Sequence, residues 1–267
     1  MNEIAGNQEF DNLVSLIQEL EKELSELVYE RDNLIYHICP TIKAEYMLKI
    51  GKIEYAIFEY HCKILRTKRK IEIVQAFINR EQTYNIDEIE KQLDKEYEDY
   101  IKKLLEKQRE IENARIRKDN FKELLPGDSV ELKKLYTLIV KKLHPDINPD
   151  TTEEQHRQFN DAVNAYKNGD LAELKIIYLL LEKILVTEPT NSMEKLIARK
   201  EMLLNEKEYL LGEVQRIRNE FPYNIKELIE NKEKLREKVE VLSIQLTECH
   251  EQYNEIEKRL EVMLKNE

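Results

Sequence analysis

The feature that most constrains this chain is the spacing of its apolar residues, which recur at alternating steps of three and four over long stretches. The last stretch, which begins at Ile225, is the most regular. Its core positions are Leu228, Leu235, Val239, Leu242, Leu246, Cys249, Tyr253, Ile256, Leu260 and Met263. This period is typical of helices that pack along a seam, as in coiled coils. We therefore predict an all-α fold in which each helix needs a partner for its apolar face.

The composition favours the same fold and narrows the function. The 267 residues include only 5 glycines, 6 prolines and no tryptophan, and 36% are charged, which is typical of long helices. The formal net charge of -11 disfavours a nucleic-acid partner, because phosphates are repelled unless a local basic patch dominates. The start of the chain has no signal-peptide pattern, and no apolar run approaches the ~20 residues that span a bilayer. We expect a soluble, cytoplasmic protein without a membrane anchor.

The segments divide the chain into three expected parts. Residues 1–125 form an N-terminal helical bundle or coiled coil, residues 126–187 form a central segment of shorter helices, and residues 188–267 form an antiparallel coiled-coil hairpin. In the first part, the helix predicted over 40–79 is apolar on two faces and should be packed on both. In the last part, the longer arm needs a further helix over its seam. That helix comes from the N-terminal region or from a second copy of the chain.

The central segment contains a sharp interruption, KKLHPDINPD, at residues 141–150. A capping-box pattern at 128–131 predicts the start of the helix before it, and a second pattern at 151–154 predicts the start of the helix after it. Gly169 is expected to end that second helix, and Asp170 with Glu173 to start a third. Two helices joined by a short loop can bury one shared apolar face. The loop then presents His144 and Asp146 beside the basic side of the first helix.

Residues 132–150, LKKLYTLIVKKLHPDINPD, resemble the second helix and loop of the J domain of DnaJ-like co-chaperones, and residues 159–166, FNDAVNAY, resemble that domain's third helix. In that family, a His-Pro-Asp tripeptide and a basic second helix contact a DnaK-type chaperone and trigger its ATP hydrolysis. The resemblance implies a chaperone-binding role, with no catalytic residue, no cofactor and no enzymatic activity of the chain's own. The residues to which it gives this role are His144, Pro145, Asp146, Lys133, Lys134, Lys141 and Lys142.

This chain departs from the J-domain pattern at several points. The position after the tripeptide is usually basic, but here it is Ile147. The stretch before the second helix, FKELLPGDS, lacks the aromatic-rich first helix, so we expect the helix predicted over 86–124 to pack in its place. The glycine/phenylalanine-rich linker and the cysteine-rich zinc module are absent. The resemblance therefore implies an adaptor without the client-binding barrels of the full DnaJ architecture.

Other interpretations remain beside the adaptor. The tripeptide can be a helix-breaking turn and the lysines a solvated face, which makes the chain a structural coiled-coil scaffold with an inactive J-like hairpin. The basic run KILRTKRK, residues 63–70, offers a nucleic-acid interface, which the net charge opposes. Each cysteine lies near a histidine, but Cys39 and Cys62 should be roughly 30 Å apart along a helix. We expect no metal site, and the client of an adaptor cannot be named.

Overall fold

The computed structural model describes residues 2–120, 125–184 and 192–265, and these residues are helical with no strand among them, which confirms the all-α class. Two short π-helical segments, η1 and η2, and one 3-10 turn, η3, lie between the α-helices. In chain order the elements are α1 Asn2–Asn33, η1 Leu34–Ile38, α2 Cys39–Tyr46, η2 Met47–Gly51, α3 Lys52–Ile78, α4 Ile86–Glu96, α5 Glu98–Asn120, α6 Pro126–Leu143, α7 Glu153–Asn168, α8 Leu171–Ile184, α9 Met193–Asn219, η3 Tyr223–Ile225, α10 Lys226–Glu230 and α11 Lys232–Lys265. In this part of the chain, no helix has the length and apolar character needed to cross a membrane.

The helices form two compact units, each built from segments that are far apart in the sequence. The first unit combines residues 1–40 with 122–224, and the second combines 41–121 with 225–267. This division differs from the expected boundaries after residues 125 and 187, and the second of those boundaries lies outside the described residues. A heptad pattern fixes which face of a helix is buried but not which helix covers it.

The partners of α9 and α11 illustrate that difference. In the first unit α9 packs along α1, and in the second α11 packs along α3. The seam predicted along α11 is buried or half-buried throughout the helix. Its cover therefore comes from the N-terminal half of the same chain. α3 also packs on α4 and α5, so helices from three other segments lie against this part of the helix predicted over 40–79.

The predicted start of the helix over 86–124 agrees with the structure, whereas its predicted continuity does not. Asn85 caps α4 by accepting the N–H of Asp87, but the helix predicted over 86–124 is interrupted at Tyr97, which divides α4 from α5. Pro40 lies inside α2 and does not end a helix. The wider π-helical turn directly before it accommodates a residue that cannot donate a backbone hydrogen bond.

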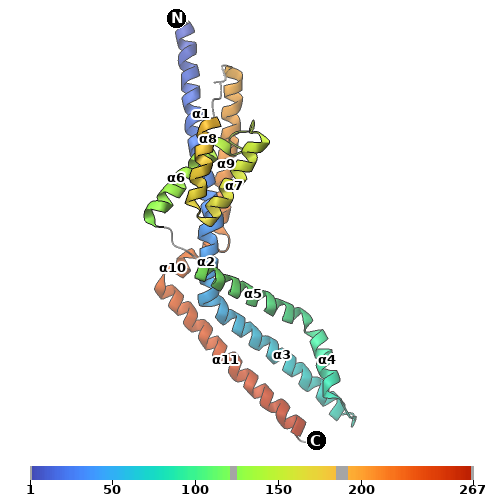
Figure 1. Ribbon diagram of the computed structural model, residues 1–267. Helices are drawn as coiled ribbons and strands as arrows, with labels where there is room; N and C mark the ends of the chain where they lie inside the picture. Colours follow the sequence, from blue (N-terminus) through green and yellow to red (C-terminus); the bar gives the residue numbers. More distant parts are fainter. Residues whose placement is uncertain (1, 121–124, 185–191, 266–267) are drawn as a thin grey trace. The chain divides into compact units, whose positions relative to one another are not determined.

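The first unit contains the J-like segment, which we define as α6, the following loop, α7 and α8. These helices gather around α1 and α9 (Figure 1). One continuous core joins them, with fully buried side chains from every helix of the unit. Its largest members are Leu24, Tyr136, Ile139, Leu143, Ile147, Tyr166, Leu174, Leu181, Leu203 and Leu210. Within this unit α1 packs against α6.

Candidate partner-docking site

The His-Pro-Asp loop begins where α6 ends. The N–H of His144 donates to the carbonyl of Val140 at 2.9 Å, and the His144 backbone then leaves the helical region. Pro145 has no N–H with which to continue the helix. The chain turns back on itself, because the N–H groups of Ile147 and Asn148 both donate to the His144 carbonyl, at 3.0 and 2.8 Å. The loop is thus a compact, internally bonded turn.

The helices on either side of the loop begin and end at recognisable residues. α7 starts with a capping box one residue later than the pattern suggested: Thr152 accepts from the Gln155 N–H, and the Gln155 side chain accepts from the Thr152 N–H. Gly169 ends α7 with a φ of 67°, a conformation that favours glycine. Asp170 caps α8 as expected. The expected capping box at 128–131 is wrong, because α6 begins earlier, at Pro126.

The imidazole of His144 is buried rather than presented to solvent. Only 4% of the residue is exposed, and its ring packs edge-on against Phe159 of α7, with the ring centroids 5.2 Å apart. Its Nδ1 accepts the N–H of Asp146 at 3.2 Å, which requires an unprotonated Nδ1. Burial lowers the pKa of His144 below its usual value, and the nearby Asp146 carboxylate opposes that shift. The ring is therefore neutral at pH 7.

This burial predicts a loss of stability in mild acid. Because the pKa of His144 is lower in the folded state than its ordinary 6.5, the unfolded chain takes up the proton first as the pH falls. We expect the free energy of unfolding to decrease from about pH 6.5 downward. His144→Gln, which cannot titrate, should show a smaller decrease. Chemical denaturation of both proteins at several pH values measures the difference, and parallel curves would contradict the prediction.

The other predicted residues lie on the open side of the segment. The Asp146 side chain is 48% exposed and its carboxylate lies 3.7 Å from Nδ1 of His144. Lys133 and Lys134 are exposed, while Lys141 and Lys142 are half-buried. These four lysines, which we call the lysine face, run along the outer side of α6 between α1 and α8. A positive surface therefore adjoins the exposed Asp146.

Three of the four lysines have partners within the first unit. The Nζ of Lys133 lies 4.8 Å from the ring centroid of Tyr29, and that of Lys142 lies 5.4 Å from the ring centroid of Tyr178. The Nζ of Lys141 lies 3.9 Å from a carboxylate oxygen of Glu21 on α1. Such contacts position the side chains without neutralising most of the charge.

A buried polar cluster fixes the J-like segment to α1. The hydroxyl of Tyr136 donates to Asp32 at 2.5 Å, and Arg31 donates to the same carboxylate at 2.9 Å. The Tyr136 ring also stacks on Tyr166, with centroids 4.1 Å apart, and the Tyr166 hydroxyl donates to Asn33. Burial, together with the charge of Asp32, raises the pKa of Tyr136 well above its usual value, so this hydroxyl stays a donor.

Sequence reasoning missed the residues of α9 that lie at the loop. Arg199 donates to the carbonyl of Ile147 at 3.2 Å, and Glu206 is close enough to Asp146 to be affected by its charge. No periodicity could have identified them, because they lie more than 50 residues further along the chain. The one available signal was Ile147 itself, an apolar residue where the J-domain pattern is basic.

The basic run at 63–70 lies on α3 in the second unit and is largely paired with carboxylates. Arg66 contacts Glu90 and Asp94 of α4, each at 2.6 Å, while Arg69 contacts Glu96 at 3.1 Å. These carboxylates supply counterions from the chain itself. The run is thus a paired helix surface, and a phosphate backbone would have to displace those partners.

The cysteines and histidines do not assemble a metal centre in the described part of the chain. Cys249 of α11 lies 3.6 Å from the Nε2 of His61 on α3, a pairing that spacing along the sequence did not suggest. No group of three or more potential ligands accompanies it among these residues. Burial raises the pKa of the Cys249 thiol, which favours the protonated form over a thiolate ligand.

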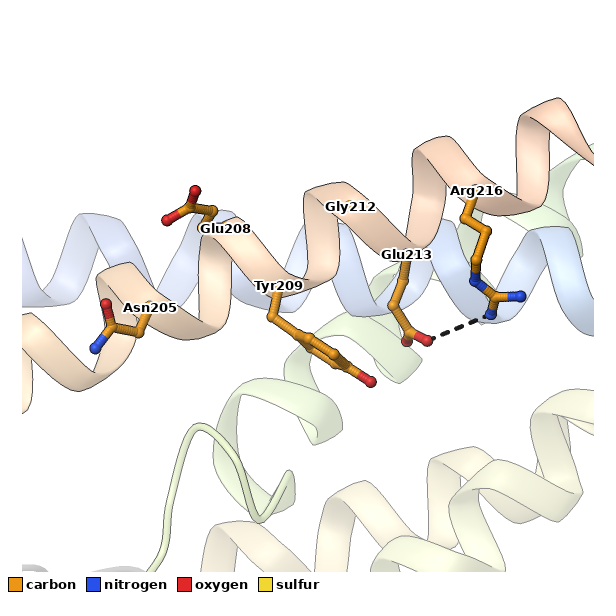
Figure 2. Close-up of a pocket in the computed structure, with 6 residues that line it drawn as sticks. All are labelled: Asn205, Glu208, Tyr209, Gly212, Glu213 and Arg216. Atoms are coloured by element: carbon orange, nitrogen blue, oxygen red, sulfur yellow. Dashed lines mark ion pairs between the residues drawn. The ribbon is translucent and has the colours of Figure 1, made fainter.

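A depression of about 620 Å³ lies along α9, and Figure 2 shows the residues that line it. Its lining residues are Asn205, Glu208, Tyr209, Gly212, Glu213 and Arg216. The Tyr209 side chain extends across it, and Glu213 pairs with Arg216 at 3.6 Å. A ligand site normally joins polar groups from several elements in an enclosed cleft. Because one helix supplies this lining, we do not assign it a ligand.

A comparison with protein-family models, with curated proteins and with solved structures finds no significant match for this chain.

Proposed function

We propose that this protein is an adaptor that recruits a DnaK-type chaperone and accelerates its ATP hydrolysis. The observation that carries the proposal is the placement of a half-exposed Asp146 in a His-Pro-Asp loop, directly after a helix whose outer face bears four lysines. The resemblance to the J domain gives these residues a chaperone-binding role. Charge complementarity with an acidic partner surface would chiefly set the association rate and the specificity.

A structural scaffold is the second candidate, and a specific observation favours it. His144 is almost fully buried, and Ile147 belongs to the core of the unit. A loop held in this way suits a packing role, in which the J-like segment stabilises α1 and α9 and binds no chaperone. The two candidates differ in one measurable property, the effect on a chaperone's ATP hydrolysis.

The decisive experiment is single-turnover ATP hydrolysis by a DnaK-type chaperone from the same cell. We expect the intact protein to accelerate hydrolysis and His144→Gln to return it to the chaperone's own rate. His156→Gln is the matched control, because it makes the same substitution within α7, where the His156 side chain hydrogen-bonds to the nearby Thr151. It should keep the acceleration. A natively folded protein that produces no acceleration would exclude the adaptor and leave the scaffold.

A further inference from the structure

A hydrogen bond and a shared apolar core connect the His-Pro-Asp loop with α9. The Ile147 side chain is fully buried in a core that includes Leu203 and Leu210 of α9. The guanidinium of Arg199 donates to the backbone carbonyl of Ile147 at 3.2 Å. The residue that follows the tripeptide is thus bound through its side chain and through its backbone.

Arg199 also joins this attachment to α1 and, through α1, to the lysine face. The same guanidinium nitrogen lies 2.7 Å from Glu21, whose side chain is only 17% exposed. Lys141 reaches the other carboxylate oxygen of Glu21 at 3.9 Å. One carboxylate therefore holds both the arginine that binds the loop and a lysine of the candidate docking surface.

A second residue of α9 acts against this attachment. Glu206 is close enough to Asp146 to be affected by its charge, and one of its carboxylate oxygens, Oε1, is buried without a hydrogen-bond donor among the described residues. Burial, then the negative charge of Asp146, raises the pKa of Glu206; Arg31 of α1 opposes the shift and Glu213 adds to it. A hydrogen bond between the two carboxyl groups needs a proton on one of them. When both are ionised they repel each other.

We propose that α9 is an autoinhibitory clasp that keeps the His-Pro-Asp loop from a chaperone until the Arg199 contact opens. This inference rests on the proposed adaptor function. Arg199 and Glu206 act on the same turn in opposite directions, so a change at either residue should shift the closed state in opposite senses. Closure leaves the lysine face open for a first encounter while Ile147 remains buried.

The test uses two substitutions in the full chain with opposite expected effects. Arg199→Gln weakens the hold on the loop, so it should lower the concentration of protein that half-saturates chaperone stimulation by about tenfold, the scale of a lost hydrogen bond to a charged group. Glu206→Gln removes the repulsion and can donate to Asp146, so it should raise that concentration. Lys207→Gln is the matched control. It removes an α9–α1 ion pair, Lys207 with Glu23 at 2.7 Å, away from the loop.

Hydrogen exchange at Ile147 and Asn148 provides a readout that does not depend on the chaperone. Both amides donate to the His144 carbonyl in the closed loop. We expect faster exchange in Arg199→Gln, slower exchange in Glu206→Gln and no change in Lys207→Gln. Circular dichroism of each variant shows whether the helices are retained.

The outcomes separate this inference from the proposed function. The clasp would be overturned if Arg199→Gln and Lys207→Gln changed the half-saturating concentration equally. It would also be overturned if Arg199→Gln and Glu206→Gln shifted that concentration in the same direction. Unchanged exchange in Arg199→Gln would also overturn it, whatever His144→Gln does to the chaperone. If exchange responds as expected but no variant accelerates hydrolysis, the adaptor function fails, and autoinhibition fails with it.

Discussion

Replacing Asp32 with alanine is expected to lower the free energy of unfolding of the first unit by about 3 kcal/mol. Asp32 is only 3% exposed, and it accepts hydrogen bonds from the hydroxyl of Tyr136 and from Arg31. Without it, a fully buried hydroxyl has no acceptor and a mostly buried guanidinium loses its closest partner. Leaving such groups unpaired costs more than the original bonds contribute, because their desolvation is no longer compensated. Chemical denaturation followed by circular dichroism measures the loss.

A control substitution on α1 tests whether the loss of stability comes from the burial of Asp32 or only from the removal of a negative charge. Glu30 also pairs with an arginine, Arg218 of α9, but both side chains are more than one-third exposed. Glu30→Ala should therefore cost less than about 1 kcal/mol. A double-mutant cycle of Asp32→Ala with Tyr136→Phe isolates the coupling between the two side chains. If Asp32→Ala costs no more than Glu30→Ala, the polar cluster does not fix the J-like segment to α1.

The seam of α11 shows how much of the fold the sequence determines. Every core position predicted between Leu235 and Met263 is buried or half-buried, because a period near 3.5 residues selects one face of a helix. The same period does not identify the helix that covers this face. Several helices of this chain carry compatible apolar stripes, so periodicity alone cannot choose α3 for α11 or α1 for α9. That choice depends on packing and on ion pairs between distant residues.

For the candidate site, too, one part could be predicted from the sequence and another part could not. The loop itself could be located, because Pro145 stops one helix and the cap residues around Thr152 start the next. The environment of the loop could not, because it depends on α1 and α9. Exposure of His144 was the expectation for a docking residue, yet the ring packs inside against Phe159. The apolar residue at position 147 accounts for part of that difference, since its burial brings the loop inward.

Ile147 is therefore the residue through which the loop and the core are most directly coupled, and Ile147→Ala is expected to destabilise the first unit by about 3 kcal/mol. The side chain is fully buried and belongs to the apolar core that also contains residues of α1, α6 and α9. Alanine removes most of that burial and leaves a cavity that helices held by other contacts can close only in part. Ile147→Val removes one methylene and should cost about 1 kcal/mol. Chemical denaturation of the two variants measures whether the loss of stability grows with the number of atoms removed.

The matched control is Leu179→Ala on α8, which truncates an aliphatic side chain of similar size that is 58% exposed. It should change the free energy of unfolding by no more than about 0.5 kcal/mol, because little apolar surface leaves the core. A loss in Ile147→Ala as small as in Leu179→Ala would mean that the loop is not anchored in the core. In that case the buried His144 would have to be held by α7 alone, and the attachment of the loop to α9 would lose its apolar half.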